Sequence, residues 1–167
     1  DDKPRLLVLT DIGGDPDDKM SMVRLLVYAH HFDIEGLVAT SVNEAVNPQL
    51  IEKVVSAYGR VRDNLEQHEP GYPPAAYLRE RIAFGPVVDG VKGVGEGMDS
   101  PGSELLIRSV DRDDPRPVWV TVWGGPSVLA QALWKVRETR SPEELDAFVA
   151  KLRVYAISDQ DDSGPWI

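Results

Sequence analysis

The sequence predicts an α/β protein with an open, parallel, Rossmann-like sheet and helices on both of its faces. Short apolar runs alternate along the chain with segments of helical periodicity, the pattern produced by βαβ crossovers. The run at 5–10 is apolar over most of its length and closed by Asp and Gly, which is typical of a parallel strand buried on both faces. Hydrophobic residues make up 42% of the chain and charged residues 28%, as in globular proteins.

The elements follow from periodicity and from residues that start or stop helices. Asn47-Pro48 and Ser100-Pro101 each look like a helix start, and Ser141 with Glu144 forms a capping-box pattern. No periodicity is visible over 66–100, so we expect a long loop there. The expected strands are 5–10, 34–42, 118–123 and 153–157, and the expected helices are 18–31, 48–65, 101–110, 127–137 and 142–152.

The last expected strand, 153–157, is followed by no helix that could cover it. We therefore expect residues 1–167 to be the N-terminal part of one larger α/β domain, incomplete at the C-terminus. Apolar surface of the sheet would then be exposed and would pack against the rest of the domain or a second copy of the chain.

Composition excludes several classes of function. A net charge of −10 argues against nucleic acid as a partner, because phosphates require a basic face. No apolar run approaches the roughly 20 residues of a membrane helix, and the first residues lead almost at once into a strand without a signal-peptide pattern. The absence of cysteine excludes disulfides and thiolate metal sites. Cations, neutral sugars or nucleosides suit this chain better.

Polar residues follow every expected strand. In an open parallel sheet ligands bind beyond the carboxyl ends of the strands, so these segments should meet at one edge. The first strand is followed by four aspartates and the third by a Gly-Gly-Pro-Ser turn. The residues concerned are Asp11, Asp15, Asp17, Asp18, Ser41, Asn43, Glu44, Asn47, Gly124, Gly125, Pro126, Ser127, Ser158, Asp159, Gln160, Asp161 and Asp162.

The four aspartates in the segment 11–18 (the acidic loop) predict a divalent cation. Carboxylates this close repel one another unless a cation or a helix N-terminus compensates their charge. Hard oxygen donors with no His or Cys nearby favour Ca²⁺ or Mg²⁺ over zinc. A simpler interpretation is that Asp17 and Asp18 only cap the following helix, which leaves Asp11 and Asp15 unexplained.

Two segments resemble a known family. The run Leu9-Thr10-Asp11-Ile12-Gly13-Gly14-Asp15-Pro16-Asp17-Asp18 is similar to the N-terminal signature of the nucleoside hydrolases. The run Trp123-Gly124-Gly125-Pro126-Ser127-Val128-Leu129-Ala130 resembles their second calcium loop, and Asn47 before its helix resembles their sugar-binding Asn. The resemblance extends over essentially the whole chain and is nearest to the cellulose-binding, nucleoside-hydrolase-like subgroup.

This resemblance implies a set of roles. Asp11, Asp18 and the Ser127 carbonyl would bind Ca²⁺, and Asp11 would also take the proton from a calcium-held water. Asp17 would bind sugar hydroxyls with help from Asn47. Beyond the family pattern, Asp159 and Asp161 are candidate ligand contacts at the end of the last strand, or alternatively parts of a solvated turn.

Two functions remain open at this stage. One is a calcium-dependent hydrolase that cleaves an N-glycosidic or related glycosidic bond of a nucleoside or another small sugar-containing ligand. The other is a carbohydrate-binding protein that has kept the fold but not turnover, which is favoured by Leu9 and by the altered spacing of the acidic loop. A haloacid-dehalogenase-like phosphatase would need Asp at Gly13 and is discounted. Low-affinity calcium sites fill readily at extracellular concentrations, and the subgroup that the chain resembles looks secreted. Both favour an extracytoplasmic location.

Among the other residues, Trp119 and Trp123 are expected to share one face of a buried strand and to pack in the core. Tyr72, Tyr77 and Trp166 are expected in loops, where they could stack on a sugar but more simply pack. His30 and His31 at a helix end are expected to be structural or surface residues.

Overall fold

The molecule is built around one parallel sheet of five strands. In the computed structural model, which describes residues 2–158 and 161–167, the strand order is β3-β2-β1-β4-β5 and every neighbouring pair is parallel. The strands are β1 (Arg5–Thr10), β2 (Asp33–Ala39), β3 (Ile82–Phe84), β4 (Val118–Val122) and β5 (Leu152–Ala156). The predicted open, parallel α/β fold is confirmed.

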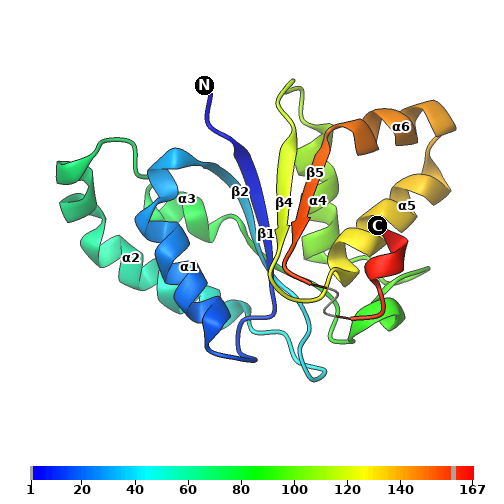
Figure 1. Cartoon of the computed structure of the whole chain (residues 1–167), viewed down its shortest axis with the longest axis horizontal. Coiled ribbons are helices and arrows are strands. Elements are labelled where there is room, and N and C mark those ends of the chain that lie inside the picture. The colour runs from blue at the N-terminus through cyan, green and yellow to red at the C-terminus, as the bar shows by residue number, and fades with distance from the viewer. Residues whose placement is uncertain (1, 159–160) are drawn as a thin grey trace.

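Helices cover both faces of this sheet, as Figure 1 shows. One layer contains α1 (Asp17–Val27), α2 (Pro48–His68) and α3 (Ala75–Arg79), and the other contains α4 (Pro101–Asp111), α5 (Ser127–Thr139) and α6 (Pro142–Ala150). Three short 3₁₀ turns, η1 (Ala29–His31), η2 (Gly90–Gly93) and η3 (Gly164–Trp166), complete the described elements. No described helix is long and apolar enough to cross a membrane.

Strand β1 divides the core into two parts because its side chains alternate between the faces. Leu6 and Val8 pack among residues of α1 and α2, whereas Leu7 and Leu9 pack with residues of α4 and α5. All six residues of the strand are buried. Its carboxyl end, and therefore the acidic loop that follows it, is held rigidly at the centre of the sheet.

The three helix starts predicted at Asn47, Ser100 and Ser141 are confirmed. Ser100 and Ser141 both form capping boxes, with Ser103 and Glu144 as their partners. Asn47 is the N-cap residue of α2 and Pro48 begins the helix, as predicted, although the Asn47 side chain makes no capping hydrogen bond. Its Oδ1 instead accepts a hydrogen bond of 3.1 Å from Gln49 Nε2.

The segment 66–100 differs from the expected loop because it contains α3 and β3. Strand β3 has only three residues, too few to show alternation in the sequence, and its pairing with β2 defines it. The first helix is also shorter than expected, ending at Val27 and giving way to η1. The second strand ends at Ala39, and a tight turn with an isolated bridge between Val42 and Ala45 follows.

Trp119 is 42% exposed, so its predicted place in the core is wrong. Val118, Val120 and Val122 face the α4–α5 core, and alternation turns Trp119 to the opposite face of the sheet. Trp123 is half-buried and packs against the core next to α1 and α2. Tyr72, expected in a loop, is buried, and its hydroxyl donates to the Val27 carbonyl at 2.7 Å.

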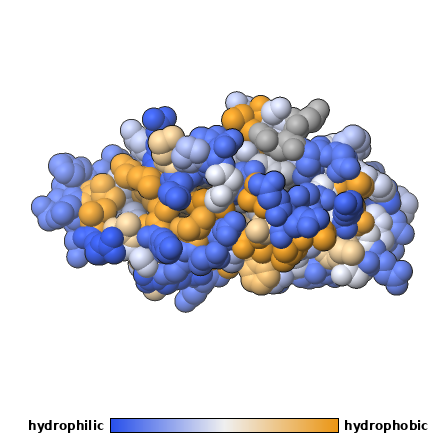
Figure 2. Space-filling view, turned by 90° about the horizontal axis from the view of Figure 1, so that it is seen from below, coloured by the Kyte–Doolittle hydropathy of each residue, from blue (hydrophilic) through white to orange (hydrophobic). Residues whose placement is uncertain are grey.

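Apolar side chains remain exposed on β5 and on the outer side of α1. Tyr155 is 67% exposed, Ile157 and Met20 64% each, and Val23 50%. In Figure 2, hydrophobic residues lie at the surface among hydrophilic ones on the side of the molecule seen from below. This exposure agrees with the expectation that further polypeptide packs here, which stays a prediction.

Candidate functional site

The loops that follow the strands meet at one edge of the sheet, at the bottom of Figure 1. A cavity of about 220 Å³ opens between them. It is lined by Asp11 after β1, by Ser41, Val42 and Asn43 after β2, by Asp89 after β3, by Gly125 after β4 and by Asp161 after β5. The parallel sheet thus brings together residues up to 150 positions apart, as the sequence predicts.

Asp18 is held in place by the last residue of β1. The Thr10 hydroxyl donates to Asp18 Oδ2 at 2.5 Å and accepts from the Ile12 amide at 3.2 Å. Asp18 is 5% exposed although it lies in the first turn of α1. Because its carboxylate points back to the strand instead of out to water, Asp18 does more than favour the helix dipole.

Asp11 lies beside Asp18, and we call this pair of carboxyl groups the Asp11–Asp18 corner. Burial and the neighbouring carboxyl group make Asp11 harder to ionise. Burial and, after it, the neighbouring Asp18 carboxyl raise the pKa of Asp11 from 3.8 to about 7. In the part of the chain that the structure describes, no Lys or Arg lies within 4.0 Å of the acidic-loop carboxylates. The site therefore carries negative charge that no described basic side chain compensates.

Two glycines let the surrounding loops approach this corner. A Cβ atom at Gly124 would lie 2.6 Å from both Cβ and Cγ of Asp11, so only glycine fits against that side chain. Gly13 has φ +113°, which favours glycine, and a Cβ there would lie 2.7 Å from Asn47 Nδ2. Asn47 therefore lies directly against the acidic loop, where the sequence predicts it.

Asp15 and Asp17 are both exposed, unlike Asp18. Asp17 and Asp18 line a second cavity of about 320 Å³ between α1 and β4–β5. Aromatic and hydroxyl groups complete its wall, with Trp123, Tyr155, Ser21 and Thr121 among them. The buried Thr121 Oγ1 makes no hydrogen bond within the described residues. This cavity adjoins the Asp11 site, because Asp18, which interacts with Asp11, lines it together with Asp17.

The remaining predicted residues lie around the same edge. Ser127 is buried at the start of α5, three residues after Gly124. Asp161 Oδ1 accepts from the Ser163 amide at 2.8 Å and from its hydroxyl at 2.5 Å. The other Asp161 oxygen lies against Gly125. Asp159 lies outside the described residues.

Two residues of the site, Thr10 and Asp89, are not predicted from the sequence. Thr10 orients Asp18, and a polar residue closing a buried strand was the available signal. Asp89 enters the cavity wall from the loop after β3 and accepts from the Glu44 amide at 3.3 Å. Because β3 is too short to recognise, nothing in the sequence marks Asp89 as a strand-end residue.

The donor chemistry fits calcium. Asp11 and Asp18 place two hard carboxylates next to each other with no described basic partner, and burial followed by the Asp18 carboxyl raises the pKa of Asp11. Ca²⁺ takes six to eight oxygen ligands, so carbonyl groups such as that of Ser127 and waters would have to supply the rest. Among the described residues, no His or Cys lines the 220 Å³ cavity, which disfavours zinc.

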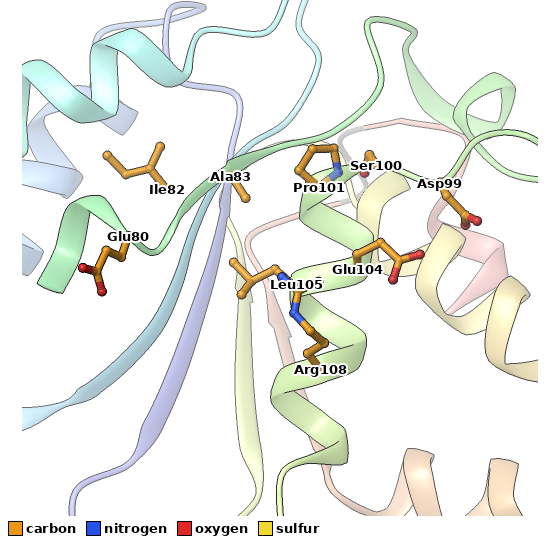
Figure 3. Close-up of a pocket in the computed structure, with 9 residues that line it drawn as sticks. All are labelled: Glu80, Ile82, Ala83, Asp99, Ser100, Pro101, Glu104, Leu105 and Arg108. Carbon is orange, nitrogen blue, oxygen red and sulfur yellow. The ribbon is translucent and has the colours of Figure 1, made fainter.

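A larger cavity of about 510 Å³ lies elsewhere, between β3 and α4 (Figure 3). Its acidic residues include Asp99 and Glu104, and both accept from Lys135 Nζ at 2.6 Å. The Lys135 ammonium lowers the pKa of Asp99. Paired carboxylates of this kind stabilise the α4–α5 contact, so size alone does not make this cavity the functional site.

Comparisons with known proteins identify the family and the fold. The family model for a cellulose-binding Sde182, nucleoside hydrolase-like domain matches residues 5–167. The solved structure of a nucleoside hydrolase-related hypothetical protein from Saccharophagus degradans, described as associated with carbohydrate metabolism, is 46% identical and superposes with a TM-score of 0.95. The similarity covers 98% of this chain and 41% of that one. A search of curated proteins found no match.

Proposed function

Because the chain belongs to the cellulose-binding Sde182, nucleoside hydrolase-like family, we propose that it is a calcium-dependent hydrolase of an N-glycosidic or related glycosidic bond. The observation that carries the proposal is the Asp11–Asp18 corner, where two carboxyl groups meet beside a cavity at the carboxyl edge of the sheet. Sites of this fold lie at that edge. A nucleoside or other small sugar-containing ligand is the proposed substrate.

The roles follow from position. Asp11 lines the cavity and, as the carboxylate, would accept the proton of the attacking water at an oxygen atom. Asp18, oriented by Thr10, would bind calcium together with Asp11 and the Ser127 carbonyl. Exposed Asp17 would accept hydrogen bonds from sugar hydroxyls, with Asn47 beside Gly13 assisting. Asp161 would contact the ligand from the opposite wall.

Calcium, when bound, would supply the positive charge that offsets these carboxylates and lowers the pKa of a nearby water. The bond from the anomeric carbon to the leaving base or aglycone would break as the water attacks that carbon, and the sugar ring has oxocarbenium-like character in such hydrolysis generally. Asp17 and Asn47 would hold the sugar in place while that charge develops.

The test is an assay for release of nucleobase or free sugar by the intact protein, with and without a chelator. We expect calcium-dependent release that Asp11→Asn abolishes and Asp15→Asn, an exposed neighbour in the same loop, leaves intact. Release that persists in excess chelator, or in Asp11→Asn, would overturn the proposal.

A non-catalytic carbohydrate-binding protein is the second candidate. It is favoured by the cavity between α1 and β4–β5, where Trp123 and Tyr155 lie next to Asp17. Aromatic rings beside a few polar groups are typical of ligand pockets. The description of the family as cellulose-binding supports the same idea.

Cello-oligosaccharide binding measured by calorimetry separates the two candidates. If the protein only binds, Trp123→Ala weakens binding and no product forms with any nucleoside or glycoside. If it hydrolyses, Asp11→Asn still binds the substrate while turnover is lost.

A further inference from the structure

A group of metal-binding side chains lies at the opposite end of α1 from the acidic loop. His30 and His31 belong to η1, which follows α1, and Glu69 follows the last residue of α2. One ligand atom from each of the three lies within 4.8 Å of the other two. Across residues 2–158 and 161–167, no other set of three His or acidic residues converges in this way.

His30 is the buried member of this cluster. It is 7% exposed, and its ring packs on Tyr72 with the centroids 4.4 Å apart. Nε2 lies 3.3 Å from Glu69 Oε2, yet neither ring nitrogen makes a hydrogen bond within the described residues. A buried imidazole whose ring nitrogens make no hydrogen bond is unfavourable, since each nitrogen needs either a donor or an acceptor. A metal ion would give it one.

His31 and Glu69 are exposed and can adjust to an ion. The His30 and His31 rings lie with their centroids 3.8 Å apart, because the 3₁₀ turn after α1 brings the two consecutive side chains to the same side. The Glu69 side chain is 59% exposed. Water and ions therefore reach the cluster from one side, while Tyr72 holds His30 from the other.

The charge environment favours a cation. The carboxyl end of α1, where η1 begins, carries partial negative charge. Glu66, the other acidic residue near His30, already accepts from the Gly71 and Tyr72 amides at 3.0 Å. Its oxygens are therefore occupied, and Glu69 is left as the free carboxylate ligand.

We propose that His30, His31 and Glu69 bind a divalent transition-metal ion of the zinc class. Two imidazoles and one carboxylate form a frequent protein ligand set for zinc with a fourth position left to water. Ligand atoms around such an ion stand about 3.3–3.5 Å apart for bonds of about 2.0–2.1 Å. The His30–Glu69 distance of 3.3 Å already meets this spacing, and the exposed His31 can turn to close the rest.

The site differs in kind from the acidic loop. Nitrogen donors favour zinc, copper or nickel over calcium, whereas the acidic loop offers only oxygen. The inference is therefore independent of the proposed hydrolase function, and either can fail without the other.

Titration calorimetry with Zn²⁺ alone tests the proposal. We expect one ion per chain, with affinity lowered by about tenfold or more in His31→Ala and in Glu69→Gln. Both residues are exposed, so the variants should fold, and far-UV circular dichroism checks this. His68→Ala is the matched control, because His68 is exposed one residue before Glu69 and lies outside the cluster. Its affinity should not change.

A second variant separates the cluster from the acidic loop. Asp18→Asn should leave Zn²⁺ binding unchanged, and Co²⁺ in place of zinc should give visible absorption bands that His31→Ala removes. Absence of stoichiometric Zn²⁺ binding, or unchanged affinity in both His31→Ala and Glu69→Gln, would overturn the proposal. Loss of binding in Asp18→Asn or in His68→Ala would do the same.

Discussion

Both edges of the sheet carry charged side chains. Those at the amino edge are paired, whereas the carboxylates at the carboxyl edge have no described basic partner. At the amino edge, the fully buried Arg5 donates to both Glu35 oxygens, at 2.6 and 3.0 Å, and to the carbonyls of Ser109 and Arg116. At the carboxyl edge, Asp11 and Asp18 meet with no described basic side chain to pair with them. Charge at the first edge is paired within the fold, whereas charge at the second has no described basic partner.

The pKa values of two aspartates, one at each edge, are shifted in opposite directions. Hydrogen bonds from Arg116 hold the pKa of Asp114, at the amino edge, well below its usual range. Burial and the Asp18 carboxyl raise the pKa of Asp11 to about 7. Opposite shifts in one residue type distinguish a structural ion-pair network from a site whose charge a bound cation could offset.

The largest expected effect is a loss of folding stability when the buried Arg5–Glu35 ion pair at the amino edge is broken. Glu35→Ala leaves the Arg5 guanidinium buried without its main partner, and loss of one member of a buried pair costs about 3 kcal/mol or more. Urea unfolding measures the difference. Glu52→Ala is the matched control, because its pair with Arg79 is exposed and should contribute less than about 1 kcal/mol. Equal losses in the two variants would show that the Arg5 network is not structural.

The next effect concerns calcium and pH. Because a cation competes with the proton on Asp11, whose pKa is about 7, calcium affinity should rise by about tenfold between pH 6 and pH 8. Calorimetry at the two pH values measures this change, and buffers of different ionisation enthalpy report the proton released. An affinity that does not vary over this range would mean that calcium does not bind at Asp11.

A smaller effect is expected in the calcium-free protein. A pKa raised from 3.8 to about 7 means that the folded state holds the Asp11 proton more tightly than the unfolded state does. This contribution to stability is present below about pH 4 and is lost as the pH rises through about 7. Asp11→Asn should therefore be more stable than the parent at pH 8, by about 1 kcal/mol after allowance for solvent screening.

Urea unfolding in chelator at pH 8 and pH 4 checks this expectation, and the difference should shrink at pH 4. A variant that is less stable than the parent at pH 8 would show that the Asp11 charge is already compensated. Asp15→Asn serves as the control, because Asp15 is exposed.

The sequence predicts the carboxyl edge better than the amino edge, for a physical reason. The fold follows from alternating strands and helices, and parallel pairing then places the residues after each strand at one edge. Asp11, Gly125 and Asp161 could therefore be brought together from sequence alone. Contacts that depend on irregular backbone could not be predicted from the sequence. Glu35 reaches Arg5 at a register shift between β1 and β2, and Asp89 follows a strand of three residues.

The directions in which particular side chains point could not be predicted from the sequence either. The side of β4 that Trp119 faces follows from which alternate residues meet α4 and α5, and Asp17 differs from Asp18 only in its position on the first turn of α1. The His30–Glu69 contact joins the ends of two helices through a tertiary fold that local periodicity does not encode.

Titration of the intact protein with Ca²⁺ at pH 8 decides whether Asp11 and Asp18 bind calcium, as we propose. Asp18→Asn and Asp15→Asn remove the same charge from the same loop, but only Asp18 is buried against Thr10. We expect one calcium ion per chain, an affinity lowered by about tenfold or more in Asp18→Asn, and a change of less than about threefold in Asp15→Asn. Equal affinities in the two variants would contradict this proposal.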